Sequence, residues 1–106
     1  MNLIEKLKRF LGLNAGIDLK ALIAGGARII DVRSAAEYAN GHVKGSTNIP
    51  LGILTNKAGR FKKDEPIITC CASGVRSRSG KAILQSNGFT HVYNGGSWYS
   101  LNKYVK

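Results

Sequence analysis

The stretch IITCCASGVRSRSGKAILQSNG, residues 67–88, joins two different patterns of side chains. Its first part is a short apolar run rich in β-branched residues, which predicts a buried strand over 67–70. Residues 75–87 are typical of a helix, which Gly88 ends. One face of that helix carries Val75, Ser79, Ala82, Ile83 and Ser86. The stretch therefore predicts a strand, a tight loop and a helix, as found in folds with a parallel sheet.

The same alternation of strand and helix continues on both sides of this stretch. Further strands are predicted over 27–32, 46–49 and 91–93. Residues suited to a helix start stand at Asp18, at Ser34 with Glu37 as a capping box, and at Pro50. A last helical segment is predicted over 97–104. Strands that alternate with helices indicate an α/β sandwich around a mostly parallel sheet.

The loop contains two adjacent cysteines, and its spacing alone leaves both open as the functional one. Counted from Cys70, five residues precede Arg76, which is the spacing of a phosphate-binding loop; counted from Cys71, the loop is one residue shorter. Ligands of such sheets bind beyond the carboxyl ends of the strands. Loop amides and the positive end of the following helix would form an anion cradle there. Gly74 suits a left-handed conformation, and a thiol in that field loses its proton more readily.

Length and composition predict one soluble domain with reduced thiols in the cytoplasm. The chain has 106 residues, and no apolar run approaches the ~18 residues of a membrane span. Its formal net charge is +10, from 16 Lys and Arg against 6 Asp and Glu. Such a field attracts anions. The basic residues are scattered, so no specific nucleic-acid binding is predicted, and adjacent cysteines lack the spacing of zinc ligands.

Residues 1–16 are predicted to be an extension that precedes a domain over 17–106. Apolar residues within 2–11 have the spacing of an amphipathic helix: Leu3, Ile4, Leu7, Phe10 and Leu11. Docking of this helix onto the domain is favoured over contact of residues 1–13 with an anionic membrane.

Three motifs in this order resemble the rhodanese family of sulfurtransferases. They are IIDVRSAAEYANGHVKGSTNIPL (29–51), CASGVRS (71–77), and GF followed by VYNGGSW (88–98). The resemblance covers nearly the whole chain after about residue 17. It implies a three-layer sandwich in which a mostly parallel, five-stranded sheet is flanked by helices.

The resemblance also selects the cysteine, because Gly74 matches the family's loop glycine only when Cys71 is the first loop residue. The chemistry agrees, since a phosphatase that used Cys70 would need a neighbouring acid to protonate the leaving oxygen. Thr69 also stands where such phosphatases usually carry histidine. Cys71 is therefore the predicted nucleophile, and Cys70 is predicted to fill the end of the strand as a small hydrophobic side chain.

The implied site extends from this nucleophile through the loop. The predicted substrate-binding residues are Ala72, Ser73, Gly74, Val75 and Arg76. Asp31 and Arg33 are predicted to support the site, with Asp31 bonded to backbone or basic groups near the loop and Arg33 paired with Glu37.

The implied activity is transfer of sulfane sulfur through a persulfide on Cys71. The donor would be thiosulfate or a persulfide, and the acceptor a thiol or cyanide. The reaction needs no metal or organic cofactor. Two alternatives stay open: a non-catalytic rhodanese-like binding or regulatory module, and a phosphatase or arsenate reductase that depends on Cys70.

Overall fold

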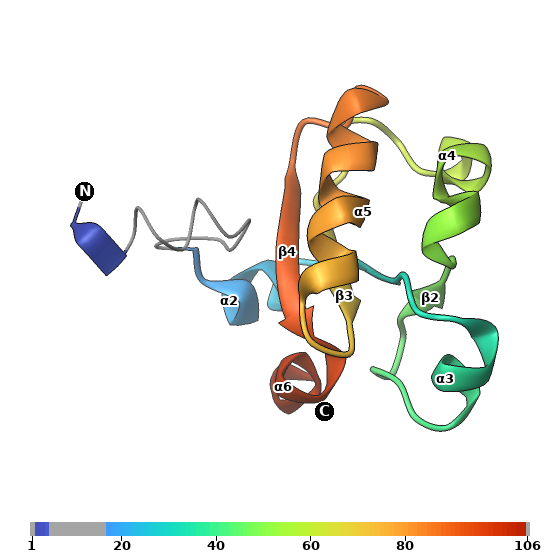
Figure 1. The fold of residues 1–106 in the computed structure, drawn as a ribbon. Helices are drawn as coiled ribbons and strands as arrows, with labels where there is room; N and C mark the ends of the chain where they lie inside the picture. The colour runs from blue at the N-terminus through green and yellow to red at the C-terminus, as the bar shows by residue number, and fades with distance from the viewer. Residues whose placement is uncertain (1, 5–16, 106) are drawn as a thin grey trace.

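The computed structural model describes residues 2–4 and 17–105 and contains one parallel sheet (Figure 1). Its strands are β1 (Arg28–Asp31), β2 (Thr47–Asn48), β3 (Ile67–Cys71) and β4 (Val92–Ser97). They lie in the order β2-β1-β3-β4, and every neighbouring pair is parallel. The predicted α/β fold is confirmed. The described part of the chain holds four strands, one fewer than the resemblance implied, because the segments between them form helices and turns.

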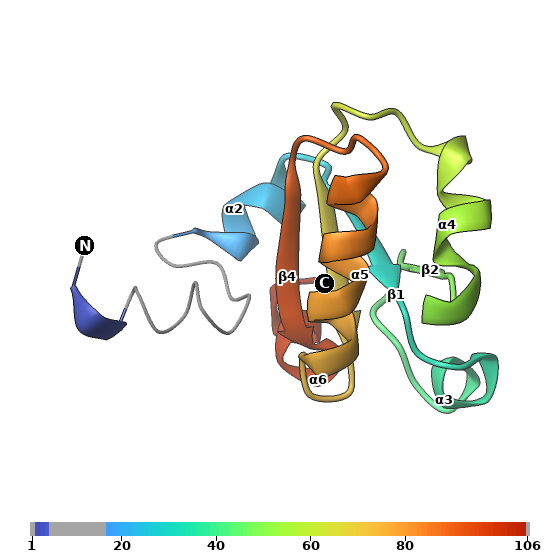
Figure 2. The same cartoon turned by 45° about the horizontal axis from the view of Figure 1, so that its top comes forward.

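Short helices cover both faces of the sheet (Figures 1 and 2). On one side lie α4 (Leu54–Lys57) and α5 (Val75–Ser86), and on the other α2 (Leu19–Ala24) and α6 (Trp98–Leu101). The helix α3 (Ala35–Ala39) lies beyond the carboxyl end of β1. Residues 17–105 also contain three single-turn 3-10 helices: η1 (Leu51–Ile53), η2 (Ala58–Arg60) and η3 (Asn102–Tyr104). This arrangement gives three layers.

Two of the predicted helix starts, Asp18 and Ser34, are confirmed by their hydrogen bonds, and the third, Pro50, directly precedes the 3-10 helix η1. Asp18 caps α2, because its carboxylate accepts from the backbone N–H of Ala21 at 3.0 Å. Ser34 and Glu37 form the reciprocal capping box at the start of α3. Local sequence therefore determines where these short helices begin, and tertiary packing supplies most of their stability.

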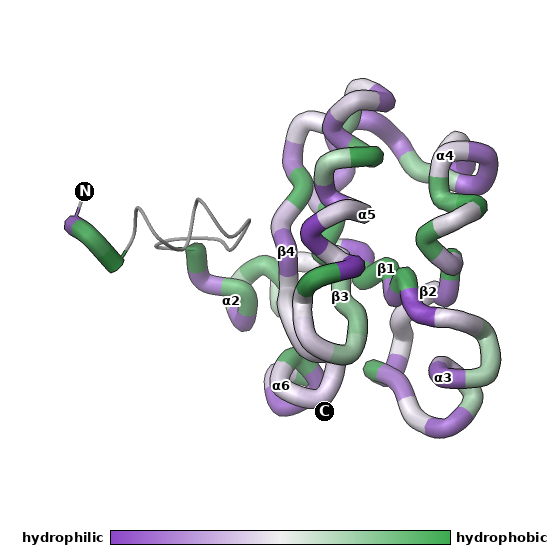
Figure 3. Tube along the Cα trace, viewed as in Figure 1, coloured by the Kyte–Doolittle hydropathy of each residue, from purple (hydrophilic) through white to green (hydrophobic). Residues whose placement is uncertain are grey.

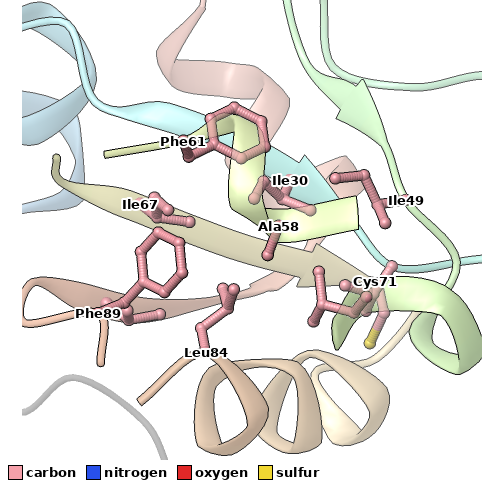
Figure 4. Packing of buried hydrophobic residues seen from close by; sticks show 11 residues of the cluster. Ile30, Ile49, Ala58, Phe61, Ile67, Cys71, Leu84 and Phe89 are labelled. Atoms are coloured by element: carbon pink, nitrogen blue, oxygen red, sulfur yellow. The ribbon is translucent and has the colours of Figure 1, made fainter. Parts of the chain in front are cut away.

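The sheet is buried on both faces, so each face has its own core. All five residues of β3 are buried, as is usual for a parallel strand covered on both sides. The core beneath α4 and α5 contains Ile30, Ile67, Leu84, Phe89 and Cys71, among others (Figure 4). The core on the opposite face contains Ile29, Val43, Ile68, Cys70 and Leu101. In Figure 3, β3 has the green of hydrophobic residues, whereas α5 carries both green and the purple of hydrophilic residues.

Of the predicted face of α5, only Ile83 packs against the core, whereas Val75, Ser79, Ala82 and Ser86 are exposed. The buried face of α5 carries Ser77, Gly80 and Leu84, whereas the side chain of Val75 is 72% exposed. Small residues lie on this face because α5 packs close to the sheet: a Cβ on Gly80 would lie 3.2 Å from Cγ1 of Val32. Because Ser77 and Gly80 are not hydrophobic, the pattern of apolar residues in the sequence did not predict this face.

A β-bulge interrupts the pairing of β3 with β4 at Gly95 and Gly96. Thr69 pairs with Asn94 and Cys71 with Ser97, so β4 carries one extra residue between these pairs. A Cβ on Gly95 would lie 2.6 Å from Cγ2 of Ile68 and 2.9 Å from the carbonyl oxygen of Thr69. The bulge thus brings the backbone of β4 unusually close to β3, directly beside the loop that follows β3.

Replacing Gly95 with alanine is expected to lower the free energy of unfolding by about 1–3 kcal/mol, because the added methyl group meets backbone as well as a side chain. Urea denaturation followed by circular dichroism measures this change. Gly59→Ala is the matched control, since nothing lies within 4 Å of its Cβ position, and it should change stability by less than about 0.5 kcal/mol. Equal effects of the two substitutions would contradict the prediction.

The prediction of an N-terminal helix over 2–11 lies mostly outside the described residues. Leu3 and Ile4 are helical, and their side chains are 81% and 65% exposed. The division of the chain at residue 16 stays a prediction. Within residues 2–4 and 17–105, no helix is long and apolar enough to cross a membrane.

Candidate active site

The loop between β3 and α5 lies at the carboxyl end of the central strands, where the sequence predicted the site (Figures 1 and 2). Gly74 is the residue before α5, and it adopts a left-handed conformation with φ 104°. A Cβ on Gly74 would lie 3.3 Å from the Cα of Gly96 in the bulge of β4. Two glycines far apart in the sequence therefore let the loop fold tightly against the strand end.

This tight loop turns backbone N–H groups toward the sulfur of Cys71. The amide of Gly74 donates to the Cys71 Sγ at 3.0 Å, and the amide of Ser77 donates at 3.4 Å. The hydroxyl of Ser77 lies 3.6 Å from the same sulfur. Donors in this arrangement stabilise the charged form of a thiol.

The pKa of the Cys71 thiol consequently lies below its usual range. Burial acts to raise this pKa, but hydrogen bonds from the hydroxyl and amide of Ser77 and from the amides of Gly74 and Ser73 outweigh burial. Cys71 is only 1% exposed, so a reactant must reach its sulfur through the mouth of the loop. The geometry supports a nucleophilic thiolate.

Cys70 has the opposite environment, because side chains of a strand alternate between the two faces of its sheet. Its side chain is fully buried in the core on the opposite face from α5. Burial, followed by the charge of Asp31, raises the pKa of its thiol far above the usual range. The predicted role of Cys70 as a small hydrophobic side chain at the strand end is consistent with this position.

Arg76 connects the loop to α3. Its guanidinium donates to both carboxylate oxygens of Glu37, at 2.6 and 2.9 Å. Arg76, together with hydrogen bonds from the backbone and side chain of Ser34, lowers the pKa of this carboxyl to about 2. Both side chains are more than one third exposed, so the pair lies at the surface of the site. The other predicted loop residues, Ala72, Ser73 and Val75, are exposed at its rim.

The predicted pairing of Arg33 with Glu37 is wrong. Arg33 instead forms a buried ion pair with Asp31, with Nη2 and Oδ2 2.7 Å apart; Asp31 is the last residue of β1, and Arg33 follows it by two residues. Its guanidinium also donates to the carbonyl oxygens of Glu37 and Gly41 and lies over the ring of Trp98. The expected bond between Asp31 and a basic group is confirmed, and the pair fastens the segment after β1.

Two residues that contact the loop from inside the protein, Ser77 and Asn94, were not predicted from the sequence. Ser77 contacts the Cys71 sulfur, and Asn94 on β4 accepts a hydrogen bond from the Ser77 hydroxyl at 2.6 Å. Both side chains are buried. The sequence marks these two positions only weakly. Ser77 is a serine one residue after Arg76, and Asn94 is an asparagine before a Gly-Gly pair; both residue types are common in ordinary turns, so neither indicated a functional role.

Residues 17–99 match the model of a family described as the rhodanese-like domain. The chain is 36% identical over 69 residues to the thiosulfate sulfurtransferase GlpE of Stutzerimonas stutzeri, covering 65% of this chain and 63% of that protein. It is 33% identical over 93 residues to the protein HIGH ARSENIC CONTENT 1 of Arabidopsis thaliana, covering 76% and 55%. The chain thus spans between half and two thirds of the length of these relatives.

A solved structure described as rhodanese with anions from E. coli has the same fold. It superposes with a TM-score of 0.67 and 33% sequence identity, covering 70% of this chain and 89% of that one.

Proposed function

This chain belongs to the family of rhodanese-like domains, and on that premise we propose that it is a sulfurtransferase whose nucleophile is Cys71. It takes sulfane sulfur from thiosulfate or a persulfide donor and passes it to a thiol or to cyanide. The observation that supports this proposal best is the Cys71 sulfur itself, which accepts hydrogen bonds from loop amides and has a lowered pKa.

In the first step, the Cys71 thiolate attacks the outer sulfur of thiosulfate. A bond forms between Sγ and this sulfur, while the bond to the sulfite sulfur breaks and sulfite leaves with the electron pair. The product is a Cys71 persulfide with its negative charge on the terminal sulfur. Backbone amides from Ala72 to Arg76 are proposed to stabilise that charge, as an oxyanion hole does.

In the second step, the acceptor attacks the terminal sulfur. With cyanide, a carbon–sulfur bond forms, the bond between the two sulfur atoms breaks, and Cys71 leaves as a thiolate with thiocyanate as the product. This two-step covalent reaction predicts ping-pong kinetics and requires no metal or organic cofactor.

Thiosulfate is proposed as a donor because the chain resembles GlpE, which is named a thiosulfate sulfurtransferase, and because its net charge of +10 attracts a dianion. Arg76 and the buried pair of Asp31 and Arg33 are proposed to hold the loop in place rather than to react. The two cysteines are free thiols, which is consistent with the cytoplasmic setting that we propose.

Mass spectrometry after treatment with thiosulfate tests this proposal directly. We expect the intact chain to gain one sulfur atom, located on the peptide that contains Cys71, and cyanide to remove it as thiocyanate. A chain that takes up no sulfur, yet keeps the Cys71 thiol accessible to alkylation, would indicate a binding module instead.

A further inference from the structure

A buried chain of hydrogen bonds runs from the Cys71 sulfur into the protein through Ser77 and Asn94. Ser77 belongs to the first turn of α5 and is 0% exposed; Asn94 belongs to β4 and is 2% exposed. The Ser77 Oγ lies 3.6 Å from the Cys71 Sγ and 2.6 Å from the Asn94 Oδ1. The proposed reaction assigns no task to these two side chains.

Backbone groups fix the orientation of the Asn94 amide. The N–H of Gly96 donates to Oδ1 at 2.9 Å, and Nδ2 donates to the carbonyl oxygen of Gly74 at 3.2 Å. A backbone N–H can only donate and a carbonyl can only accept, so the side chain cannot be turned around. Oδ1 is therefore the atom that faces Ser77, and it accepts the hydroxyl hydrogen.

The single hydrogen of the Ser77 hydroxyl has two oxygen acceptors within reach, Oδ1 of Asn94 at 2.6 Å and the carbonyl oxygen of Gly74 at 3.1 Å. When Cys71 is a thiol, its S–H donates to the Ser77 oxygen, and the hydroxyl hydrogen goes to Asn94, the nearer of the two acceptors. When Cys71 is a thiolate, the sulfur only accepts, and the hydroxyl hydrogen can turn toward it. Asn94 Oδ1 is not left unsatisfied by that turn, because it keeps the N–H of Gly96.

We propose, on the premise of the sulfurtransferase function above, that the Ser77 hydroxyl is a hydrogen-bond switch held by Asn94. It donates to the Cys71 thiolate in the free enzyme and returns to Asn94 when Sγ becomes the inner sulfur of the persulfide. That inner sulfur has two covalent bonds and no negative charge, so it is a poor acceptor. Ser77 and Asn94 are thus positioning residues, which act through the sulfur of Cys71.

The switch affects the two half-reactions differently. A donor to the thiolate raises the thiolate fraction at neutral pH but lowers the nucleophilicity of each thiolate. In the discharge step the same sulfur is the leaving group, and a stabilised thiolate leaves faster. The hydroxyl should therefore help sulfur uptake only below the pKa of Cys71, whereas it should help discharge at every pH.

The charged groups near Cys71 come from several elements and remain unchanged in this switch. Arg76 on α5 and Glu37 on α3 neutralise each other, as do Asp31 at the end of β1 and Arg33 after it. Cys70 lies on the far face of β3, and Lys81 follows Ser77 by one turn of α5. Ser77 and Asn94 are neutral, so their effect on Cys71 is one of hydrogen bonding.

Ser77→Ala tests the switch, with Ser86→Ala in the exposed last turn of α5 as the matched control. Iodoacetamide alkylation of the Cys71 peptide, followed across pH by mass spectrometry, reports the thiolate fraction. We expect the profile of Ser77→Ala to move to higher pH and its rate near neutral pH to fall roughly tenfold, since one hydrogen bond to a charged group is lost. The plateau at high pH should not fall, and Ser86→Ala should match the unmodified chain.

Half-reactions with thiosulfate and cyanide complete the test. For Ser77→Ala we expect slower discharge at every pH, and uptake on the alkaline plateau that is as fast as in the unmodified chain or faster. If the substitution only displaced the loop, uptake on the alkaline plateau would fall as well, and that result would overturn the proposal. An alkylation profile of Ser77→Ala that does not move along the pH axis would also overturn it. If the profile moves but the unmodified chain forms no persulfide, the sulfurtransferase function fails, and with it the return of the hydroxyl to Asn94.

Asn94→Asp provides a second variant of nearly the same shape. Its carboxylate should hold the Ser77 hydroxyl more tightly and repel the thiolate, so the alkylation profile should again move to higher pH. The shift caused by Asn94→Asp should be smaller in a chain that already carries Ser77→Ala, because the part transmitted by the hydroxyl is gone. Equal shifts in both backgrounds would show that Asn94 does not act through Ser77.

Discussion

Replacing Cys71 with serine is expected to lower thiosulfate–cyanide sulfur transfer by more than about a thousandfold. A serine hydroxyl in this loop stays protonated at neutral pH, and loss of the nucleophile removes both half-reactions together. The loop amides that stabilise a thiolate remain in place, so the variant still presents the anion cradle. Thiocyanate production measures the turnover, and mass spectrometry should detect no sulfur on the protein.

Cys70→Ser is the matched control, because it makes the same chemical change at the neighbouring residue. The Cys70 side chain lies in the opposite core, so most of the turnover should remain. A buried hydroxyl in that core costs about 1–3 kcal/mol of stability, and circular dichroism should confirm that the variant is folded at the assay temperature. An active Cys71→Ser chain beside a folded but inactive Cys70→Ser chain would show that the assigned nucleophile is wrong.

The different environments of the two cysteines follow from strand geometry that the sequence already contained. Successive side chains of β3 point to opposite faces, so only one of two adjacent cysteines can face the first turn of α5. Sequence patterns predicted the existence of the strand, the loop and the helix, and also the caps at Asp18 and Ser34. Each of these features depends on residues close together in the chain.

Contacts between distant segments were the part that the sequence did not reveal. Glu37 pairs with Arg76 rather than Arg33 because the fold brings α3 beside the loop, and no local pattern encodes that approach. Asn94 reaches Ser77 because it follows Val92 by two residues and so lies on the face of β4 that α5 covers. The buried face of α5 could not be predicted from hydrophobicity either. Gly80 lies on that face because a Cβ there would approach the side chain of Val32 too closely, and a glycine adds no hydrophobic side chain to the pattern.

Loop length is expected to separate sulfur transfer from phosphate chemistry. Inserting one glycine after Ser73 would lengthen the spacing from Cys71 to Arg76 to that of a phosphate-binding loop. The insertion would also move the amide of Gly74 away from the Cys71 sulfur, where it now lies at 3.0 Å. Since misplacement of a reacting group by about 1 Å can cost on the order of a hundredfold, we expect kcat/KM for thiosulfate to fall by about that factor.

A glycine inserted after Asp64 is the matched control, because this exposed turn precedes β3 at the opposite end of the strand from the loop. That variant should keep its sulfur transfer, which would separate the effect of loop geometry from the effect of chain length. Sulfur transfer that survives the insertion after Ser73 would mean that the loop amides contribute little.

The unmodified chain is expected to show negligible hydrolysis of aryl phosphates. Its loop from Cys71 to Arg76 is one residue shorter than a phosphate-binding loop counted from Cys70, and the Cys70 thiol is buried on the other face with a raised pKa. The carboxylate of Glu37 is committed to Arg76 and has a pKa of about 2, so it is a poor acid for a leaving oxygen. Robust phosphate hydrolysis or arsenate reduction that disappears in Cys70→Ser would overturn the assignment of Cys71, because the nucleophile would then have to come from the opposite core.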